Sequence, residues 1–138
     1  MKALLAAALV CVACFAEAAN AQADFDLGRK YRNGAGVVRD SERAYRLVRS
    51  AAILQHPAAM FTLSNMLVAG EGVRPDIAAA RTWLEAAAAL ENPEALQQLA
   101  LHLQDGTLGY APDEARAAEL LRALAHAMKH RDHRKALH

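Results

Sequence analysis

Residues 58–93 read AAMFTLSNMLVAGEGVRPDIAAARTWLEAAAALENP, and this stretch decides the fold. Leu63 and Leu67 share one face of a predicted helix, since residues four apart lie one turn above each other. The glycines at 70 and 72 then end this helix, because glycine enters positive φ without a Cβ clash. Asp76 can accept from the free N–H groups of a second helix, so the stretch predicts two helices joined by a glycine turn.

The same block occurs on either side of this stretch. GAGVVRD at 34–40 lies 36 residues before GEGVRPD at 70–76, and a looser third copy has one residue inserted in its turn at 107–110. A repeat of this length is the signature of stacked helical hairpins. We therefore predict an all-α fold, a short α/α solenoid of about three antiparallel hairpins. The predicted units are residues 24–56, 57–92 and a degenerate third at 93–128, followed by a basic, histidine-rich tail at 129–138.

Small residues recur in the second helix of each unit. Ala44 and Ala80 occupy equivalent positions, so we expect helices to cross closely there. Trp83 lies on the same face and is predicted to be in the core. The ends of a short stack expose apolar surface, of which Phe25 and Phe61 are predicted to be part. A homodimer or a larger complex would cover that surface.

The beginning of the chain has the features of an export signal. A positive charge at Lys2 precedes an uncharged apolar run over residues 3–15, and two small-x-small cleavage sites follow at 19–21 and 21–23. This order is typical of a secretory signal peptide. We therefore predict that residues 1–23 are removed, and that the protein is periplasmic or secreted, with no membrane contact after cleavage. A retained anchor is the alternative, although the run is short for a transmembrane helix.

Composition excludes several function classes. The formal net charge of +1 favours neither nucleic acid nor a membrane surface. Both cysteines, Cys11 and Cys14, lie in the predicted signal, so the mature chain would have no disulfide, thiolate metal site or cysteine nucleophile. No serine lies in a nucleophile elbow, and the glycine pairs belong to helix-hairpin turns rather than to a phosphate loop. We therefore predict no catalytic residues and no cofactor.

The repeated block resembles the Sel-one-like repeat family, a branch of the tetratricopeptide-like helix-hairpin repeats. The matching residues are Leu27-Gly28, Tyr31, Gly34, Gly36, Val37, Asp40, Ala44 and Ala51-Ala52 in the first unit, and Leu63, Gly70, Gly72, Val73, Asp76, Ala80, Trp83 and Ala87-Ala88 in the second. The third unit keeps Leu99, Gly106, Asp113, Ala117 and Ala125. Leu47, Ser64 and Leu67 replace the family's tryptophan, glycine and tyrosine. The resemblance implies a non-enzymatic adaptor for protein or peptide partners in envelope, stress or host-contact processes.

The first helices of such stacks usually line the hollow of the superhelix. Equivalent positions along the three first helices form mixed polar and apolar rows, which suit a peptide or a helical ligand. The predicted partner-binding residues are Asp26, Arg29, Lys30, Thr62, Asn65, Met66, Gln98, Leu101 and His102.

Two alternatives to a peptide-binding scaffold remain. His126, His130 and His133 fall at i, i+4 and i+7, so a helix would align them on a solvent-facing stripe that suits a transition metal. The basic residues around this stripe oppose a cation and favour a polyanion or an acidic partner. Secreted relatives linked to β-lactam binding or hydrolysis rely on cysteine-rich frameworks, so an enzyme of that type is the less favoured alternative.

Overall fold

A computed structural model of the chain describes the backbone of residues 2–135 and the side chains of residues 14–132. The described chain consists of helices joined by short turns, without a strand. The helices are α1 (Lys2–Asn33), α2 (Ser41–Ile53), α3 (Pro57–Ala69), α4 (Ile77–Ala89), α5 (Pro93–Asp105) and α6 (Glu114–Lys135). No helix of this described part is both long enough and apolar enough to cross a bilayer.

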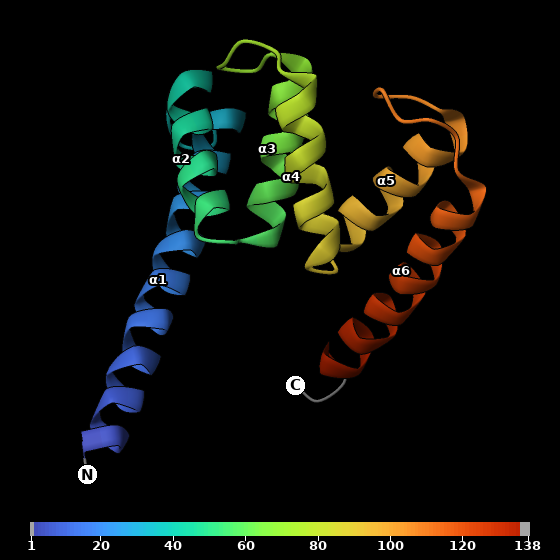
Figure 1. The fold of residues 1–138 in the computed structure, drawn as a ribbon. Coiled ribbons are helices and arrows are strands. Elements are labelled where there is room, and N and C mark those ends of the chain that lie inside the picture. The colour runs from blue at the N-terminus through green and yellow to red at the C-terminus, as the bar shows by residue number, and fades with distance from the viewer. Residues whose placement is uncertain (1, 136–138) are drawn as a thin grey trace.

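Three hairpins stand side by side (Figure 1). Helices α1 and α2, α3 and α4, and α5 and α6 pair within the hairpins, while α2 packs on α3 and α4 packs on α5. Each hairpin therefore contacts its neighbour along the chain, which is the nearest-neighbour packing of a solenoid. The prediction of an all-α solenoid with three antiparallel hairpins is confirmed.

The glycine turns are equivalent, as the repeat predicts. Gly34, Gly70 and Gly106 have φ values of +67°, +67° and +64°, so each ends a first helix in the left-handed region. The second glycine of the turn differs from one hairpin to the next. A Cβ on Gly72 would overlap the carbonyl of Ser41 at the start of α2, whereas a Cβ on Gly36 would meet no atom within 4 Å. Gly72 is thus the point where the second hairpin touches the backbone of the first.

The second helices begin with aspartate caps. The carboxylates of Asp40, Asp76 and Asp113 each accept a hydrogen bond of 2.9 Å from the backbone N–H three residues later. An aspartate in this position satisfies one of the free donors of a helix start. The predicted caps at Asp40 and Asp76 are therefore present, and Asp113 caps the third hairpin in the same way.

Small side chains dominate the core, and Ala44, Ala80 and Ala117 are fully buried. Trp83 is partly buried and packs against this core, so the indole lies at the edge of the core rather than fully inside it. Phe25 is buried rather than exposed, because its ring packs 4.7 Å from the imidazole of His56 at the start of α3. The apolar surface that a homodimer would cover therefore does not include Phe25.

Burial at equivalent positions depends on the place in the stack. Leu63 in the middle hairpin is 1% exposed, and Leu27 in the first is 38% exposed. Leu84 in α4 is 1% exposed, whereas Leu121, its counterpart in α6, is 40% exposed. In α2 and α4 this side of the helix packs against the next hairpin, whereas in α6 the same side faces solvent.

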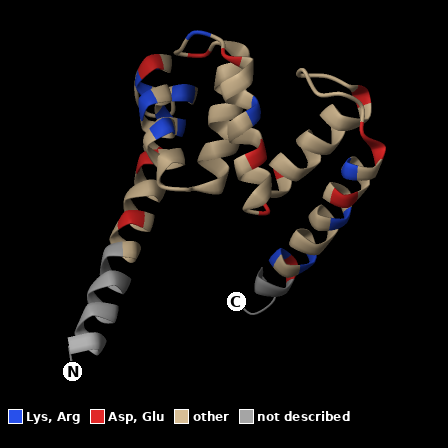
Figure 2. Cartoon of the chain, in the orientation of Figure 1, with Lys and Arg blue, Asp and Glu red and all other residues tan. Residues whose placement is uncertain are grey.

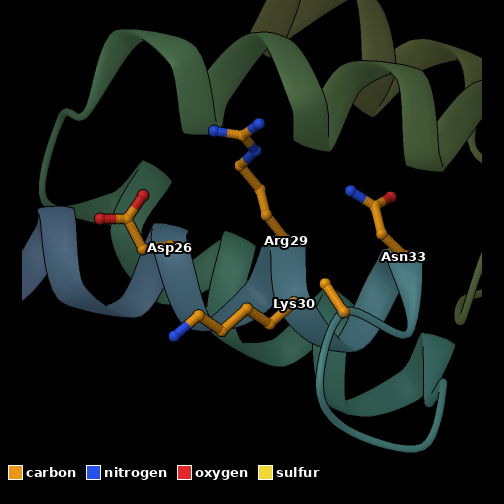
Figure 3. A pocket seen from close by; sticks show the side chains of 5 residues that line it. Asp26, Arg29, Lys30 and Asn33 are labelled. Atoms are coloured by element: carbon orange, nitrogen blue, oxygen red, sulfur yellow. The ribbon is translucent and has the colours of Figure 1, made fainter.

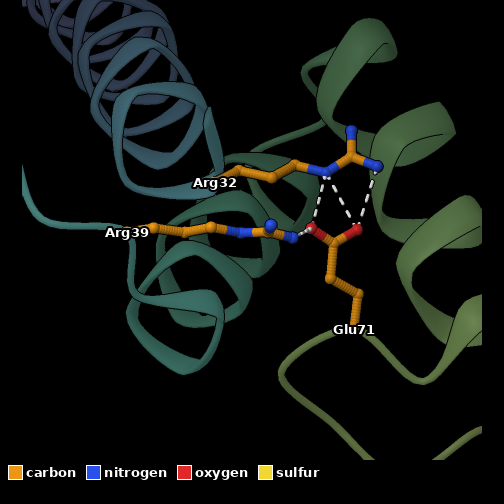
Figure 4. Close-up of polar contacts among 3 residues, drawn as sticks. All are labelled: Arg32, Arg39 and Glu71. Carbon is orange, nitrogen blue, oxygen red and sulfur yellow. Dashed lines mark hydrogen bonds and ion pairs between the residues drawn. The ribbon is translucent and has the colours of Figure 1, made fainter. Parts of the chain in front are cut away.

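A charged cluster fastens the first hairpin to the second (Figure 4). Glu71, in the second glycine turn, accepts from Nε of Arg32 at 3.1 and 3.0 Å and pairs with its Nη2 at 3.0 Å. Arg39 adds a longer pair of 3.7 Å. Two arginines share one carboxylate that is largely shielded from water, which fixes the turn on the end of α1.

The first helices of the second and third hairpins are capped by different residues at the same position. Asn92 Oδ1 accepts from the N–H of Ala95 at 2.8 Å, and His56 Nδ1 accepts from the N–H of Ala59 at 3.2 Å. An imidazole that accepts at Nδ1 is neutral, so its Nε2 donates to Gln22 Oε1, 2.9 Å away. Burial lowers the pKa of His56, against the opposing charge of Asp26.

We expect this cap to make folding stability depend on pH. A histidine whose pKa is lowered in the folded state stabilises the fold fully above the unfolded pKa of about 6.5, and this stability is lost as the pH falls. Protonated His56 can no longer accept from Ala59, and a helix N-terminus disfavours positive charge. The free energy of unfolding should be measured in urea at pH 7.5 and at pH 5.0. Between these two pH values the wild-type chain should lose about 1 kcal/mol more of this free energy than His56→Asn loses, because a helix cap typically contributes that much.

His56→Asn is the matched variant, because Asn92 shows that asparagine caps this position in the neighbouring hairpin. Burial also lowers the pKa of His102, but this group is common to both proteins and cancels in the comparison. Equal losses of stability in the two proteins between these pH values would contradict the role of His56.

Candidate functional site

Two of the three predicted rows lie open along the first helices. Asp26, Thr62 and Gln98 occupy the same position of α1, α3 and α5; Asp26 is exposed, and the other two are partly exposed. Arg29, Asn65 and Leu101 form the second row, in which Arg29 and Leu101 are exposed and Asn65 is half-buried. These six side chains are within reach of a ligand that runs across the three hairpins.

The third predicted row is broken in the middle. Lys30 is exposed and His102 is half-buried, but Met66 is 0% exposed, so assigning Met66 to a binding surface was wrong. Helix α3 packs against both α2 and α4, and Met66 lies one turn after Leu63 on the buried stripe of that helix. Lys30 escapes burial because α1 begins the stack, with a hairpin partner on one side.

One depression on this face lies on α1 (Figure 3). Asp26, Arg29, Lys30, Asn33 and Ala35 line an open hollow of about 350 Å³. Asp26, Arg29 and Asn33 point to one side of the helix and Lys30 to the other. The hollow thus offers a carboxylate, a guanidinium and a side-chain amide within two helical turns. It brings together three predicted residues of the first hairpin.

Asn33 and Ala35 were missed by the sequence reading. Asn33 lies four residues after Arg29 and seven after Asp26, which places all three on one helical face. The helical spacing could have identified Asn33. Ala35 lies in the glycine turn, whose path depends on two positive-φ residues, so no spacing rule could have placed it.

Charge is unevenly distributed among the helices (Figure 2). Basic and acidic residues gather on α1, α2 and α6, while α3 contains none and α5 few. The guanidinium carbon of Arg29 lies 5.8 Å from the ring centre of Phe25, so the two side chains form a cation–π contact. The ionic part of the candidate site is therefore confined to its α1 end, and the rest is neutral.

A second polar cluster joins α4 to the third glycine turn and has a structural role. Tyr110 donates to Glu85 Oε1 at 2.9 Å, and Arg81 lies over the Tyr110 ring at 4.1 Å while donating to the carbonyl of Gly109 at 3.1 Å. Burial and the hydrogen bond to Glu85 raise the pKa of the Tyr110 hydroxyl. Glu85 thus ties the third turn to α4.

The two histidines of α6 whose side chains are described face solvent, as predicted. His126 and His130 are exposed, and their Nε2 atoms lie 3.1 Å apart. The side chain of His133 lies outside the described residues. Within the described part of the chain, no group of three or more histidine, cysteine, aspartate or glutamate side chains is arranged to hold a metal ion.

The chain is similar to a known repeat family and to solved repeat structures. The family model described as "Sel1 repeat" matches residues 21–56, 57–92 and 93–127. A Sel1 repeat protein from Oxalobacter formigenes shares 29% identity over 78% of this chain and 44% of its own, with a TM-score of 0.75. The protein c5321 of uropathogenic Escherichia coli, a protective antigen with an SLR fold, shares 29% identity over 77% of this chain, with a TM-score of 0.70.

Both solved proteins are longer than the region they share with this chain, which spans 44% of the first and 22% of the second. Among curated proteins, none is significantly similar to it. The first family match begins at residue 21, three residues before the predicted unit. Ala21 is buried, which agrees with the start of that match.

Proposed function

Because the chain belongs to the Sel1 repeat family, a generally non-enzymatic scaffold that typically mediates protein–protein interaction, we propose that it binds a peptide segment of a partner protein along α1, α3 and α5. The observation that carries this proposal is the hollow on α1, where Asp26, Arg29 and Asn33 point to the same side. A ligand seated there meets donors and acceptors before any apolar surface.

The neutral remainder of the face suits a polypeptide backbone. Asn65 and Gln98 carry amides that both donate and accept, which matches the alternating N–H and C=O groups of a main chain. Exposed Leu101 on α5 offers an apolar contact at the far end. We infer a ligand with an acidic residue for Arg29 at one end and an apolar side chain for Leu101 at the other.

We also propose that this scaffold works outside the cytoplasm. The charged start, the apolar run and the two cleavage sites of residues 1–23 support export. Intact mass of the chain recovered from a periplasmic fraction tests it: an untrimmed chain retained in the cytoplasm would rule it out.

The binding proposal predicts that a charge reversal on α1 weakens peptide capture. Panning a library of random displayed peptides on the full chain should enrich sequences with an acidic residue, and fluorescence anisotropy then measures their affinity. Arg29→Glu should weaken binding at least tenfold, or about 1.4 kcal/mol, because an attraction becomes a repulsion at the same position. Leu101→Asp should weaken it as well, through the loss of apolar contact.

Arg49→Glu is the control, since Arg49 is also an exposed arginine and lies on α2 instead of α1. It changes the net charge identically and should alter the affinity less than twofold. Peptides that bind Arg29→Glu and Leu101→Asp as tightly as the wild-type chain would place the binding surface elsewhere.

A further inference from the structure

We propose that His126 and His130 form a two-imidazole site for a divalent transition metal ion, with Cu²⁺ bound most tightly. The two residues lie four apart on α6, so their side chains project from one face of the helix. A histidine pair with this spacing on a helix is a recurrent metal-binding arrangement. This site lies in the second helix layer and is independent of the proposed peptide face.

The distance between the two nitrogens fits a shared metal ion. Imidazole nitrogens bind zinc at about 2.0–2.1 Å, so two of them around one ion of that size lie about 2.9 Å apart at a right angle and about 3.3 Å apart at a tetrahedral angle. The Nε2 atoms of His126 and His130 are 3.1 Å apart, between these values. The rings meet edge to face, with centroids 4.4 Å apart and planes inclined by 65°. An ion can enter with small rotations of the two rings.

The pair has no competing partner among the described residues. Among these residues, each ring forms a hydrogen bond with the other ring alone, so one Nε2 donates its proton and the other Nε2 accepts it. When a metal ion binds, the donating ring carries its proton on Nδ1 instead, so that the Nε2 lone pairs of both rings bond the ion. Both side chains are exposed, so the ion keeps water in its remaining positions and little desolvation opposes binding.

The surrounding charge limits the affinity without blocking the site. Arg122, Lys129 and Arg131 are neighbours on the exposed helix, and their repulsion of a dication is screened by solvent and salt. Arg131 is turned toward α5, where its Nη1 lies 4.0 Å from Glu94 Oε1 and its Nη2 contacts the Met128 sulfur at 3.2 Å. We expect micromolar rather than nanomolar binding. Cu²⁺ ranks first because it heads the affinity order of divalent first-row ions for nitrogen ligands.

Titration of the full chain with CuCl₂ tests the site, using protein without a histidine tag and with Cys11→Ser and Cys14→Ser in every sample, because thiols also bind copper. Calorimetry should report one ion per chain with micromolar affinity, and electron paramagnetic resonance should show nitrogen ligands. His126→Ala and His130→Ala should each weaken binding at least tenfold, while His102→Ala, a histidine on α5, should leave it unchanged.

A double variant separates spacing from the number of imidazoles. His130→Ala with Arg131→His keeps two histidines but moves the second to five residues from His126, on another side of the helix. It also removes a repelling charge, so weak binding by this variant supports the pair all the more strongly. Copper uptake equal to that of the wild-type chain in this variant, or in both alanine variants, would overturn the site.

His133→Ala completes the set, since His133 follows His130 by three residues in the sequence. Unchanged affinity in His133→Ala supports a two-histidine site, and a loss smaller than that of His126→Ala adds a third ligand to the same pair. A loss confined to His133→Ala would overturn the proposal, as would a wild-type chain that gives neither heat nor nitrogen coupling.

Discussion

Gly72→Ala should lower the free energy of unfolding by about 3 kcal/mol, measured by urea unfolding followed by circular dichroism. Gly72 has φ +70°, where a side chain costs on the order of 1 kcal/mol. The added Cβ would overlap the carbonyl of Ser41, and overpacking of this kind costs about 1–3 kcal/mol. Because the overlap is with backbone, relief requires the first and second hairpins to move apart.

Gly36→Ala provides the matched control. Gly36 occupies the same turn position with φ +75°, but its Cβ would meet nothing within 4 Å. We expect a loss of about 1 kcal/mol, due to backbone strain alone. Equal losses for Gly36→Ala and Gly72→Ala would show that the contact between the hairpins contributes nothing.

Leu63→Ala is the second variant with a large expected effect, a loss of about 3 kcal/mol in the same measurement. Leu63 is 1% exposed, in the middle hairpin, between neighbours on both sides. Truncating a buried leucine removes its transfer free energy and leaves a cavity, which together cost about 2–5 kcal/mol. A central site has little room to collapse, so we expect a value inside this range.

Leu27→Ala tests the same repeat position where the stack begins. Leu27 is 38% exposed, so its truncation exposes less new apolar surface and leaves no closed cavity. We expect a loss below about 1 kcal/mol. If Leu27→Ala destabilised the chain as much as Leu63→Ala, burial would not explain the difference between the two hairpins.

The sequence predicts well what depends on local chemistry. Positive φ at Gly34, Gly70 and Gly106 follows from the absence of a Cβ, and the caps at Asp40 and Asp76 follow from a short carboxylate before a helix. These features repeat because each needs only a few neighbouring residues. The His56 cap could have been found the same way, from its alignment with Asn92 before a proline.

The burial of single residues is predicted less well, because it depends on which hairpins pack against the helix that carries them. Met66 and Lys30 occupy the same repeat position, yet one is in the core and the other in solvent. Leu121 and Leu84 differ for the same reason. A repeat pattern averages over these places in the stack, so it cannot assign exposure to a single residue near either end.

The candidate site shows the same difference between features set by local sequence and features set by contacts between hairpins. The rows through Arg29 and Asp26 follow from helical spacing, which the sequence contains. The cluster of Arg81, Glu85 and Tyr110 joins residues up to 29 positions apart through a turn with one inserted residue, and no local pattern predicts these contacts. Helical spacing therefore predicts which side chains share a face, but not the contacts between hairpins.

The third turn, with its one inserted residue, makes the second junction of this solenoid different from the first. At the first junction, backbone meets backbone at Gly72, whereas a Cβ on Gly109 would meet only the end of the Arg81 side chain, at 3.4 Å. Backbone contacts resist shear, and a long side chain yields to it. We therefore expect the third hairpin to shift against the second more readily than the second shifts against the first.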